Sequence, residues 1–290
     1  MNGFKSYHPS VNFIFFASVI AFSMILMHPV CLCISFASGF AYSVMLNGKN
    51  AVKFNLTVLV PMMLAAALIN VMFNHEGATI LAYLPDENPL TLESVFYGLA
   101  GAAVLVAVIC WFSCFNAVMT SDKIIYLFGR IAPSLSLILS MTLRFVPRFK
   151  SQMKKILGSQ RCIGRDVTNG SIIARAKHGI TILSIMITWA LENAVETADS
   201  MKSRGYGLSG RSAFSNFKLT GRDIGLIIFI CAADVLMAAA CMYGTAGFSY
   251  FPVTDGLNMS VYGIGAAAAY AALCVLPAVI EVREVCRWGK

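Results

Sequence analysis

Two stretches of this 290-residue chain combine arginine and glycine where an amphipathic run ends: "SQRCIGRD" at 159–166 and "MKSRGYG" at 201–207. A guanidinium group carries five N–H donors in a rigid fork that matches a carboxylate. An arginine in the last turn of a helix also gains about 0.3–1 kcal/mol from the helix dipole, and a glycine just beyond that turn ends the helix. The pattern predicts two contact points for acidic groups of another molecule. For Arg204 and Gly205, the alternative is an ordinary helix end with a solvated arginine.

Residue types that form catalytic or metal sites are scattered along the chain. The four histidines, His8, His28, His75 and His178, are far apart in the sequence, and seven of the nine cysteines lie in apolar stretches, where cysteine acts as a small hydrophobic residue. "NGKNAVK" at 47–53 lacks both the leading glycine and the Ser or Thr of a phosphate-binding loop. We therefore expect no catalytic residue, no bound metal and no cofactor, and any ATP must be handled by another chain.

The elements that position the two arginines belong to a membrane protein. Hydrophobic residues make up 58% of the chain, charged residues only 12%, and the mean hydropathy is +0.73. Stretches of about 20 apolar residues cross the bilayer as helices. Six are predicted, at 11–27, 30–46, 54–73, 95–119, 224–243 and 261–280. The first is near the lower limit of length, and we expect it to be retained because it lacks a basic leader and a cleavage site.

Basic residues predict the orientation of these spans. Sixteen of the 22 Lys and Arg residues lie between Thr120 and Arg222, whereas the loops at 74–93 and 245–260 contain none. Loops rich in Lys and Arg stay on the cytoplasmic side, so we expect a plasma-membrane protein with both termini in the cytoplasm. The basic residues that give the net charge of +8 lie beside the membrane. We therefore expect their binding partners to be lipid headgroups and an acidic protein, and not nucleic acid.

The region at 122–222 is predicted to be a cytoplasmic or interfacial insert between membrane regions at 1–121 and 223–290. Residues 122–130 are typical of a short interfacial helix, and the apolar stretch 131–146 is too short for a comfortable span. Arg144 is a candidate anchor for a helix break beside Pro147. Two long amphipathic helices are then expected, the first ending at Gly164 and the second running over 180–204, about 37 Å long. On the first, Phe149, Met153, Ile156 and Gln160 form an apolar stripe beside the basic stripe Lys150, Lys154, Arg161 and Arg165; on the second, the apolar stripe is Ile187, Leu191, Ala194, Val195, Ala198 and Met201.

These residues resemble the transmembrane T component of energy-coupling factor (ECF) transporters. The likeness includes "YHPSVNFIF" at 7–15, "NPLTLESVFYGL" at 88–99 and "LSLILSMTLRFVPRFKSQMKKI" at 135–156. The family's two coupling helices each end in an Ala-Arg-Gly triplet, and Ser203-Arg204-Gly205 is similar to the second. Aligned on Gln160, Arg161 and Gly164, the first triplet reads Cys162-Ile163-Gly164, with isoleucine at the arginine position. Arg161 and Arg165 flank it and are candidates to replace that arginine.

The resemblance implies an all-α membrane protein and a non-catalytic subunit. Each coupling helix would seat on one of two ABC-type ATPase subunits, and the membrane spans and apolar helix faces would hold a substrate-binding S component for uptake of a vitamin or a transition-metal ion. The alternative is a self-sufficient secondary transporter or channel, which would need ionisable residues within the membrane. Only Asp234 is of that kind, and we expect it to hydrogen-bond a Ser, Thr or Tyr of a neighbouring helix, although an ion relay is also possible.

Overall fold

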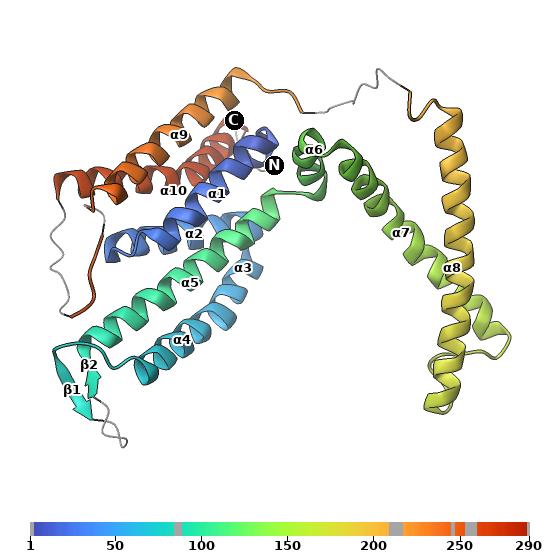
Figure 1. The fold of residues 1–290 in the computed structure, drawn as a ribbon, viewed down its shortest axis with the longest axis horizontal. Helices are drawn as coiled ribbons and strands as arrows, with labels where there is room; N and C mark the ends of the chain where they lie inside the picture. The colour runs from blue at the N-terminus through green and yellow to red at the C-terminus, as the bar shows by residue number, and fades with distance from the viewer. Residues whose placement is uncertain (1–2, 84–88, 209–216, 245–246, 253–259, 289–290) are drawn as a thin grey trace. The chain divides into compact units, whose positions relative to one another are not determined.

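The computed structural model describes residues 3–83, 89–208, 217–244, 247–252 and 260–288. It is almost entirely helical and divides into two compact units, residues 1–124 with 217–290 and residues 125–216 (Figure 1). The first unit, here called the membrane unit, contains η1 (Phe4–Ser6), α1 (Pro9–Ile25), α2 (Pro29–Asn47), α3 (Lys49–Phe54), the π-helical turn η2 (Asn55–Leu59), α4 (Val60–Phe73), β1 (Ile80–Tyr83), β2 (Pro89–Thr91), α5 (Leu92–Val118), α9 (Gly221–Met242) and α10 (Val261–Trp288).

Local sequence signals begin several of these helices. His8 and His28 cap α1 and α2 through their side chains, and each is followed by a proline at the first helical position, where its missing N–H costs nothing. The Thr91 hydroxyl accepts from the backbone N–H of Ser94 at 3.3 Å and caps α5. Thr220 and Asp223 form a reciprocal capping box at the start of α9.

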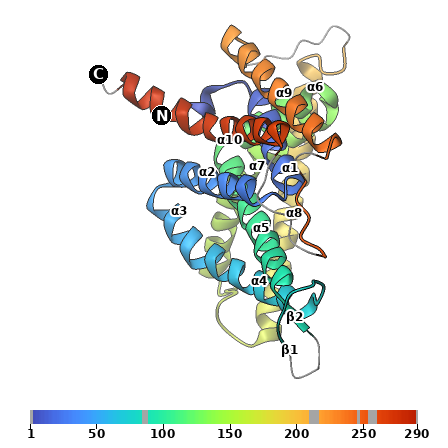
Figure 2. The same ribbon diagram turned by 90° about the vertical axis from the view of Figure 1, so that its left-hand side faces the viewer.

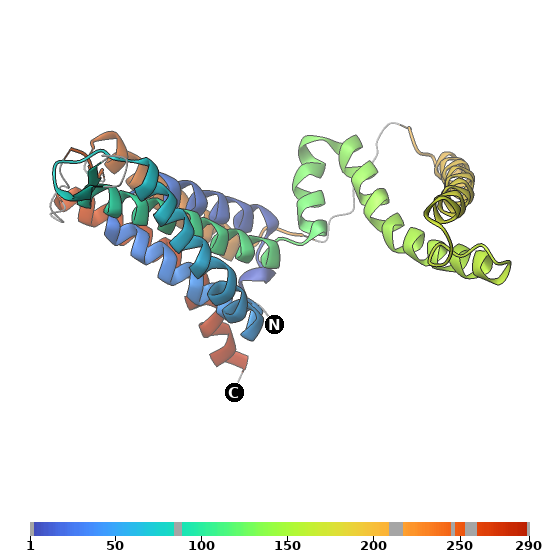
Figure 3. The ribbon, with the colours of Figure 1, turned by 90° about the horizontal axis from the view of Figure 1, so that it is seen from below.

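Helix α5 lies at the centre of the membrane unit and packs against α1, α2 and α4. These helices run side by side in Figure 3, and Figure 2 shows α3 and α4 along one flank of α5. The core around α5 is aromatic: Phe15 and Trp111 are fully buried, with ring centroids 6.0 Å apart. Edge-to-face contacts of this kind add to the burial of apolar area.

A buried hydrogen-bond network joins four helices of the membrane unit, α1, α2, α5 and α10. The Ser23 hydroxyl lies 2.6 Å from the Tyr270 hydroxyl and 2.9 Å from that of Ser35, and Trp111 Nε1 donates to Ser35 Oγ at 3.2 Å. Polar groups in hydrocarbon must find partners within the protein. The network therefore fixes how α1, α2, α5 and α10 face one another.

Six helices within the described residues are long and apolar enough to cross a membrane, which confirms the predicted all-α, multi-pass architecture. Five of them match predicted spans: α2, the continuous helical segment from Lys49 to Phe73, α5, α9 and α10. The sixth is α8 (Ile172–Ser203), predicted instead to be a coupling helix. Helix α1 matches the remaining predicted span but has only 17 residues, about 26 Å. The β1–β2 hairpin between α4 and α5 was not predicted.

The second unit, here called the hairpin unit, comprises α6 (Ser121–Ile131) from Ile125 onward, α7 (Pro133–Cys162) and α8. The predicted break near Pro147 is wrong, because α7 continues through this proline. A proline removes a single backbone donor, and a helix of 30 residues retains its other hydrogen bonds. Helix α8 also begins eight residues earlier than predicted, since the Ser171 hydroxyl accepts from the N–H of Ala174 and caps it.

Helices α7 and α8 meet through a small apolar contact. Ile156, Ile182 and Met186 are buried there, and the rings of Phe149 and Trp189 pack edge to face with centroids 5.3 Å apart. The predicted apolar stripe of α8 is not part of this contact. Three of its members, Ile187, Leu191 and Val195, are 51–63% exposed.

Candidate functional site

The end of α7 is a Schellman motif built on Gly164. The N–H of Gly164 donates to the carbonyl oxygen of Arg161 at 3.0 Å, and the N–H of Arg165 donates to that of Gln160 at 2.9 Å. Gly164 has a φ of +79°, in the left-handed region that glycine adopts without strain. These bonds satisfy carbonyl groups that a helix end leaves open, so the chain turns sharply and leaves Ile163 and Arg165 exposed.

The end of α8 has the same construction. The N–H of Gly205 donates to the carbonyl oxygen of Lys202 at 3.0 Å, the N–H of Tyr206 donates to that of Met201 at 3.0 Å, and Gly205 has a φ of +80°. Superposing the motifs places Gly164 on Gly205 and Ile163 on Arg204. The backbone therefore gives the same register as the sequence alignment, with isoleucine where the second end has arginine.

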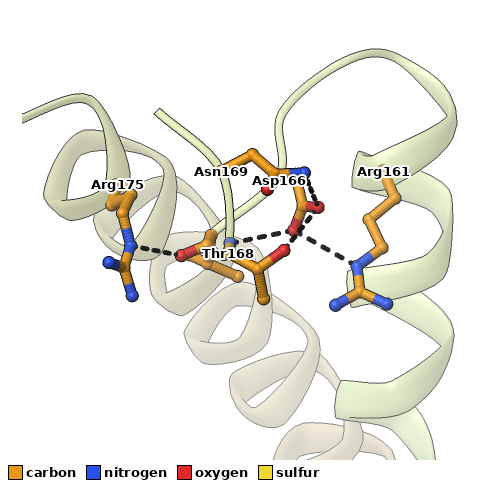
Figure 4. Close-up of polar contacts among 6 residues, drawn as sticks. Arg161, Asp166, Thr168, Asn169 and Arg175 are labelled. Atoms are coloured by element: carbon orange, nitrogen blue, oxygen red, sulfur yellow. Dashed lines mark hydrogen bonds and ion pairs between the residues drawn. The ribbon is translucent and has the colours of Figure 1, made fainter. Parts of the chain in front are cut away.

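Asp166 organises the turn between α7 and α8. Arg161 Nε donates to Asp166 Oδ1 at 3.2 Å, and the hydroxyl of Thr168 donates to Oδ2 at 2.6 Å, with a further bond from Asn169 Nδ2 (Figure 4). The hydrogen bond from the Thr168 hydroxyl holds the pKa of Asp166 below its usual value. This loop is therefore ordered around one carboxylate, to which Arg161 contributes.

The flanking arginines consequently differ. The side chain of Arg161 is 55% exposed and forms an ion pair with Asp166, whereas Arg165 is exposed and its side chain has no partner among the described residues. Exposed ion pairs contribute about 0–1 kcal/mol to stability, so the pair with Asp166 stabilises the loop only slightly. Arg204 resembles Arg165: it is exposed, and its guanidinium is unpaired within the described part of the chain.

The structure gathers the predicted site residues into two groups. Gln160, Arg161, Gly164 and Arg165 lie together at the end of α7, beside the start of α8, and Ser203, Arg204 and Gly205 lie at the far end of α8 (Figure 1). Helix α8 has 32 residues and is about 48 Å long, so the two groups do not meet. The Gln160 Oε1 atom is buried without a hydrogen-bond partner among the described residues.

Sequence reasoning missed Asp166 and the contact residues Ile182, Met186 and Trp189. The run Asp166-Val167-Thr168-Asn169 carries the signal of a side-chain-stabilised turn, which would have identified the carboxylate. The helix contact carries no such signal, because α8 has apolar residues on more than one face.

Asp234 lies within α9, and Ser18 Oγ on α1 donates to its Oδ2 at 2.6 Å. This confirms the expected hydrogen bond to a serine, threonine or tyrosine of a neighbouring helix. In the described ranges, no three His, Cys, Asp or Glu residues gather in a way that suits a metal ion.

Comparison with known proteins places this architecture in a family. The family model described as cobalt transport protein (CbiQ) matches residues 6–214. ECF transporter transmembrane proteins EcfT of Exiguobacterium sibiricum and Lactobacillus helveticus are each 35% identical over 104 and 105 residues, 36% of this chain and 40% and 38% of theirs. EcfT of Bacillus subtilis is 32% identical over 104 residues, 36% of this chain and 39% of its own.

The matched stretch thus spans about two fifths of the length of these relatives. The family model covers 209 residues, well over half of the chain, and includes both helix ends that carry the predicted contacts. The chain therefore belongs to the CbiQ family, the family of ECF transporter transmembrane T components.

Proposed function

We propose that this protein is the transmembrane coupling subunit of an ECF-type ABC importer. It transmits ATP hydrolysis by two partner ATPases to a substrate-binding S component, which takes up a vitamin or a transition-metal ion. The subunit itself is non-catalytic. It lies in the plasma membrane with both termini in the cytoplasm, which places the hairpin unit, with its exposed arginines, on the side where ATPases are found.

The observation that carries the proposal is the pair of matched helix ends. Two copies of one backbone motif, around Gly164 and Gly205, are presented at opposite ends of α8, about 48 Å long. Two similar surfaces that far apart suit two similar partners better than one. Arg204 and Arg165 project from these ends with unpaired guanidinium groups among the described residues, available for carboxylates on each ATPase.

The exposed apolar side chains of the hairpin unit suit a contact with the remaining partner, the S component. Ile187, Leu191 and Val195 on α8, and Leu135 and Ile138 on α7, are each 51–63% exposed. Apolar residues gathered along two helices in this way mark a surface that another protein or lipid covers.

The alternative, a self-sufficient secondary transporter or channel, lacks comparable support. Asp234 is the acidic residue on which it rests, and the Ser18 hydroxyl already bonds one of its oxygens. A relay also needs a second titratable group nearby. The sequence places no other charged residue between Asp223 and Glu281, apart from Asp255, which lies outside the described residues.

Charge reversal at the α8 end tests the proposal. The chain would be co-expressed with its two ATPases and S component, and the ratio of ATPase to chain measured after affinity purification. We expect Arg204→Glu to reach the membrane but to lose at least one ATPase, because its carboxylate repels the acidic groups of the partner. Lys154→Glu, which reverses another exposed cation eight residues before the end of α7, is the matched control and should retain both.

Retention of both ATPases by Arg204→Glu would contradict the contact role. At the α7 end, Arg165→Ala should weaken ATPase retention more than Arg161→Ala, because Arg161 is already paired with Asp166. If neither variant weakens it, the α7 end docks through its apolar residues alone.

A further inference from the structure

The halves of α7 and α8 that lead away from their mutual contact carry opposite charges. Phe149 and Trp189 form the edge of that contact. Beyond them, residues 133–148 of α7 and 190–203 of α8 are all at least partly exposed, and the two helices separate (Figure 1 and Figure 3). These segments are here called the α7 arm and the α8 arm. The charged residues of the α7 arm are Arg144 and Arg148, whereas those of the α8 arm are Glu192, Glu196, Asp199 and Lys202.

The contact fixes which of these charges lie at the same level. The helices run antiparallel, because the end of α7 leads into the start of α8, so residues before Phe149 lie opposite residues after Trp189. Arg144 comes five residues before Phe149, about 7.5 Å along the α7 axis. Glu192 and Glu196 come three and seven residues after Trp189, about 4.5 Å and 10.5 Å along the α8 axis. The level of Arg144 is therefore midway between the two glutamates.

The same charges also lie on one side of the contact. Phe145 and Asn193 are half-buried between exposed neighbours, so they face the partner helix, and Arg144 and Glu192 each come one residue earlier. Glu196 lies one turn beyond Glu192 on the same face. Two antiparallel helices place the residues that precede their inward-facing positions on the same side, as the charged flanks of an antiparallel coiled coil do.

In this structure the opposed charges do not pair with one another. Arg148 Cζ lies 5.9 Å from the centre of the Trp189 ring, a cation–π distance, and no ion pair joins the two arms, every residue of which the structure describes. Glu192 and Glu196 are four residues apart, and like charges at this spacing destabilise a helix. A guanidinium between them would relieve that repulsion, because its five donors can bind both carboxylates.

We propose that Arg144 draws the two arms together by pairing with Glu192 and Glu196, and is thereby a positioning residue for the end of α8. The α8 arm leads to Arg204 and Gly205, so closing the arms brings this end toward α7. By the proposed function, on which this consequence rests, that end contacts an ATPase. An exposed ion pair shifts a two-state equilibrium by up to about fivefold, so the pairing biases the arms without locking them.

The distance between two spin labels on the purified full-length chain tests the pairing without any partner. Keto amino acids at Ser134 and Ser200, two exposed residues near the ends of the arms, would carry the labels, so that the native cysteines stay unlabelled. Pulsed electron–electron double resonance in nanodiscs would then give the ratio of closed to open arms. We expect both populations in the wild type and a ratio about fivefold lower in Arg144→Glu.

Three further variants separate the pairing from a general effect of charge. Arg144→Glu/Glu192→Arg/Glu196→Arg exchanges the signs and should recover the wild-type ratio. Lys150→Glu, which reverses an exposed cation on the other side of Phe149, should leave the ratio unchanged. Raising the salt from about 0.1 M to about 1 M shortens the screening length from about 10 Å to about 3 Å. The ratio should therefore fall with salt in the wild type and stay constant in Arg144→Gln, which keeps the size of the side chain without its charge.

The assembled transporter tests the consequence. With the ATPases and the S component co-expressed, Arg144→Glu should retain both ATPases but slow ATP-driven uptake about twofold or more, and the exchanged-charge variant should recover it. Equal closed populations in the wild type and Arg144→Glu would overturn the proposal, and so would a failure of exchanged charges to restore closure; neither outcome bears on the ATPase contact of Arg204. Uptake that does not follow closure would overturn it too. Loss of a partner subunit from Glu192→Arg/Glu196→Arg but not from Arg144→Glu would instead assign the two carboxylates to that subunit.

Discussion

The ammonium group of Lys123 donates to the backbone carbonyl oxygen of Lys5 over 2.7 Å. With its amide oriented to satisfy both neighbours, Asn12 accepts from Lys123 Nζ at 2.8 Å and donates to the carbonyl oxygen of Phe4 at 3.1 Å. Lys123 is only 5% exposed, and Glu281 of α10 accepts from the N–H of Phe4 at 3.4 Å. The first turn of α6, which leads into the hairpin unit, is thus attached to the N-terminal turn of the membrane unit.

Replacing Lys123 should loosen this attachment. In Lys123→Met, the carbonyl oxygen of Lys5 and the amide oxygen of Asn12 lose their buried donor, and we expect a loss of about 1–3 kcal/mol in the free energy of unfolding. Lys5→Met removes a nearby charge but keeps the backbone acceptor, so it is the control. Thermal unfolding in detergent would check both, and equal stability of the two variants would show that the contact contributes nothing.

The same contact predicts a pH dependence. Burial, with a smaller effect of the charge on Lys5, lowers the pKa of Lys123 to about 8, whereas an unfolded lysine titrates near 10.5. Between these values the folded chain holds fewer protons at this group than the unfolded chain, so stability rises with pH. The melting temperature of the wild type minus that of Lys123→Met should therefore increase from pH 8 to pH 10.5. A flat difference would refute the shifted pKa.

Gly158 inside α7 and Gly164 just beyond its end should respond to alanine in opposite ways. Gly164→Ala forces a side chain into a φ of +79° and should destabilise the helix end by about 1–2 kcal/mol. Gly158→Ala lies inside the helix with open space around its Cβ, and should stabilise it by up to about 1 kcal/mol. Hydrogen exchange of residues 159–171 would report faster exchange in the first and slower exchange in the second.

Ile163→Arg should strengthen docking at the α7 end. Ile163 occupies the backbone position that Arg204 has in the second motif, and its side chain is 62% exposed. A guanidinium there would reach the ATPase carboxylates that, by the proposed function, contact this end, and ATPase retention at raised salt should improve. Cys162→Arg, one residue earlier, is the positional control. Identical retention by the wild type and Ile163→Arg would argue against an arginine pocket at this end.

The bond between Ser18 and Asp234 should be structural. Ser18→Ala leaves Asp234 Oδ2 without its donor within the membrane, and we expect a loss of about 0.6 kcal/mol and at most about 2 kcal/mol. Asp234→Asn keeps an oxygen that accepts from Ser18 and should retain transport by the assembled complex. Abolished transport with normal folding in Asp234→Asn would instead support an ion relay.

Much of the architecture could be predicted from the sequence because its signals are local. Apolar length and charge placement predicted a multi-pass helical protein, and the glycines after two amphipathic stretches predicted helix ends at Gly164 and Gly205. The left-handed conformation that ends a helix depends only on the few residues around it, and glycine adopts that conformation without strain. Such ends can therefore be predicted from local sequence. Contacts of these ends with ATPases remain a prediction.

What only the tertiary structure decided depends on residues far apart in the chain or on competing local preferences. The break expected near Pro147 does not occur, because the rest of a long helix outweighs one lost donor. That Lys123 is buried, and that Asn55 finds no partner, depends on how α2, α5, α10 and the N-terminal turn pack around them. No sequence pattern predicts that packing, because a polar residue appears the same in the sequence whether or not its neighbours in the fold form hydrogen bonds with it. The difference between Arg161 and Arg165 also needed the structure, because the residues alone left both arginines as candidates and only the fold of the loop pairs Arg161 with Asp166.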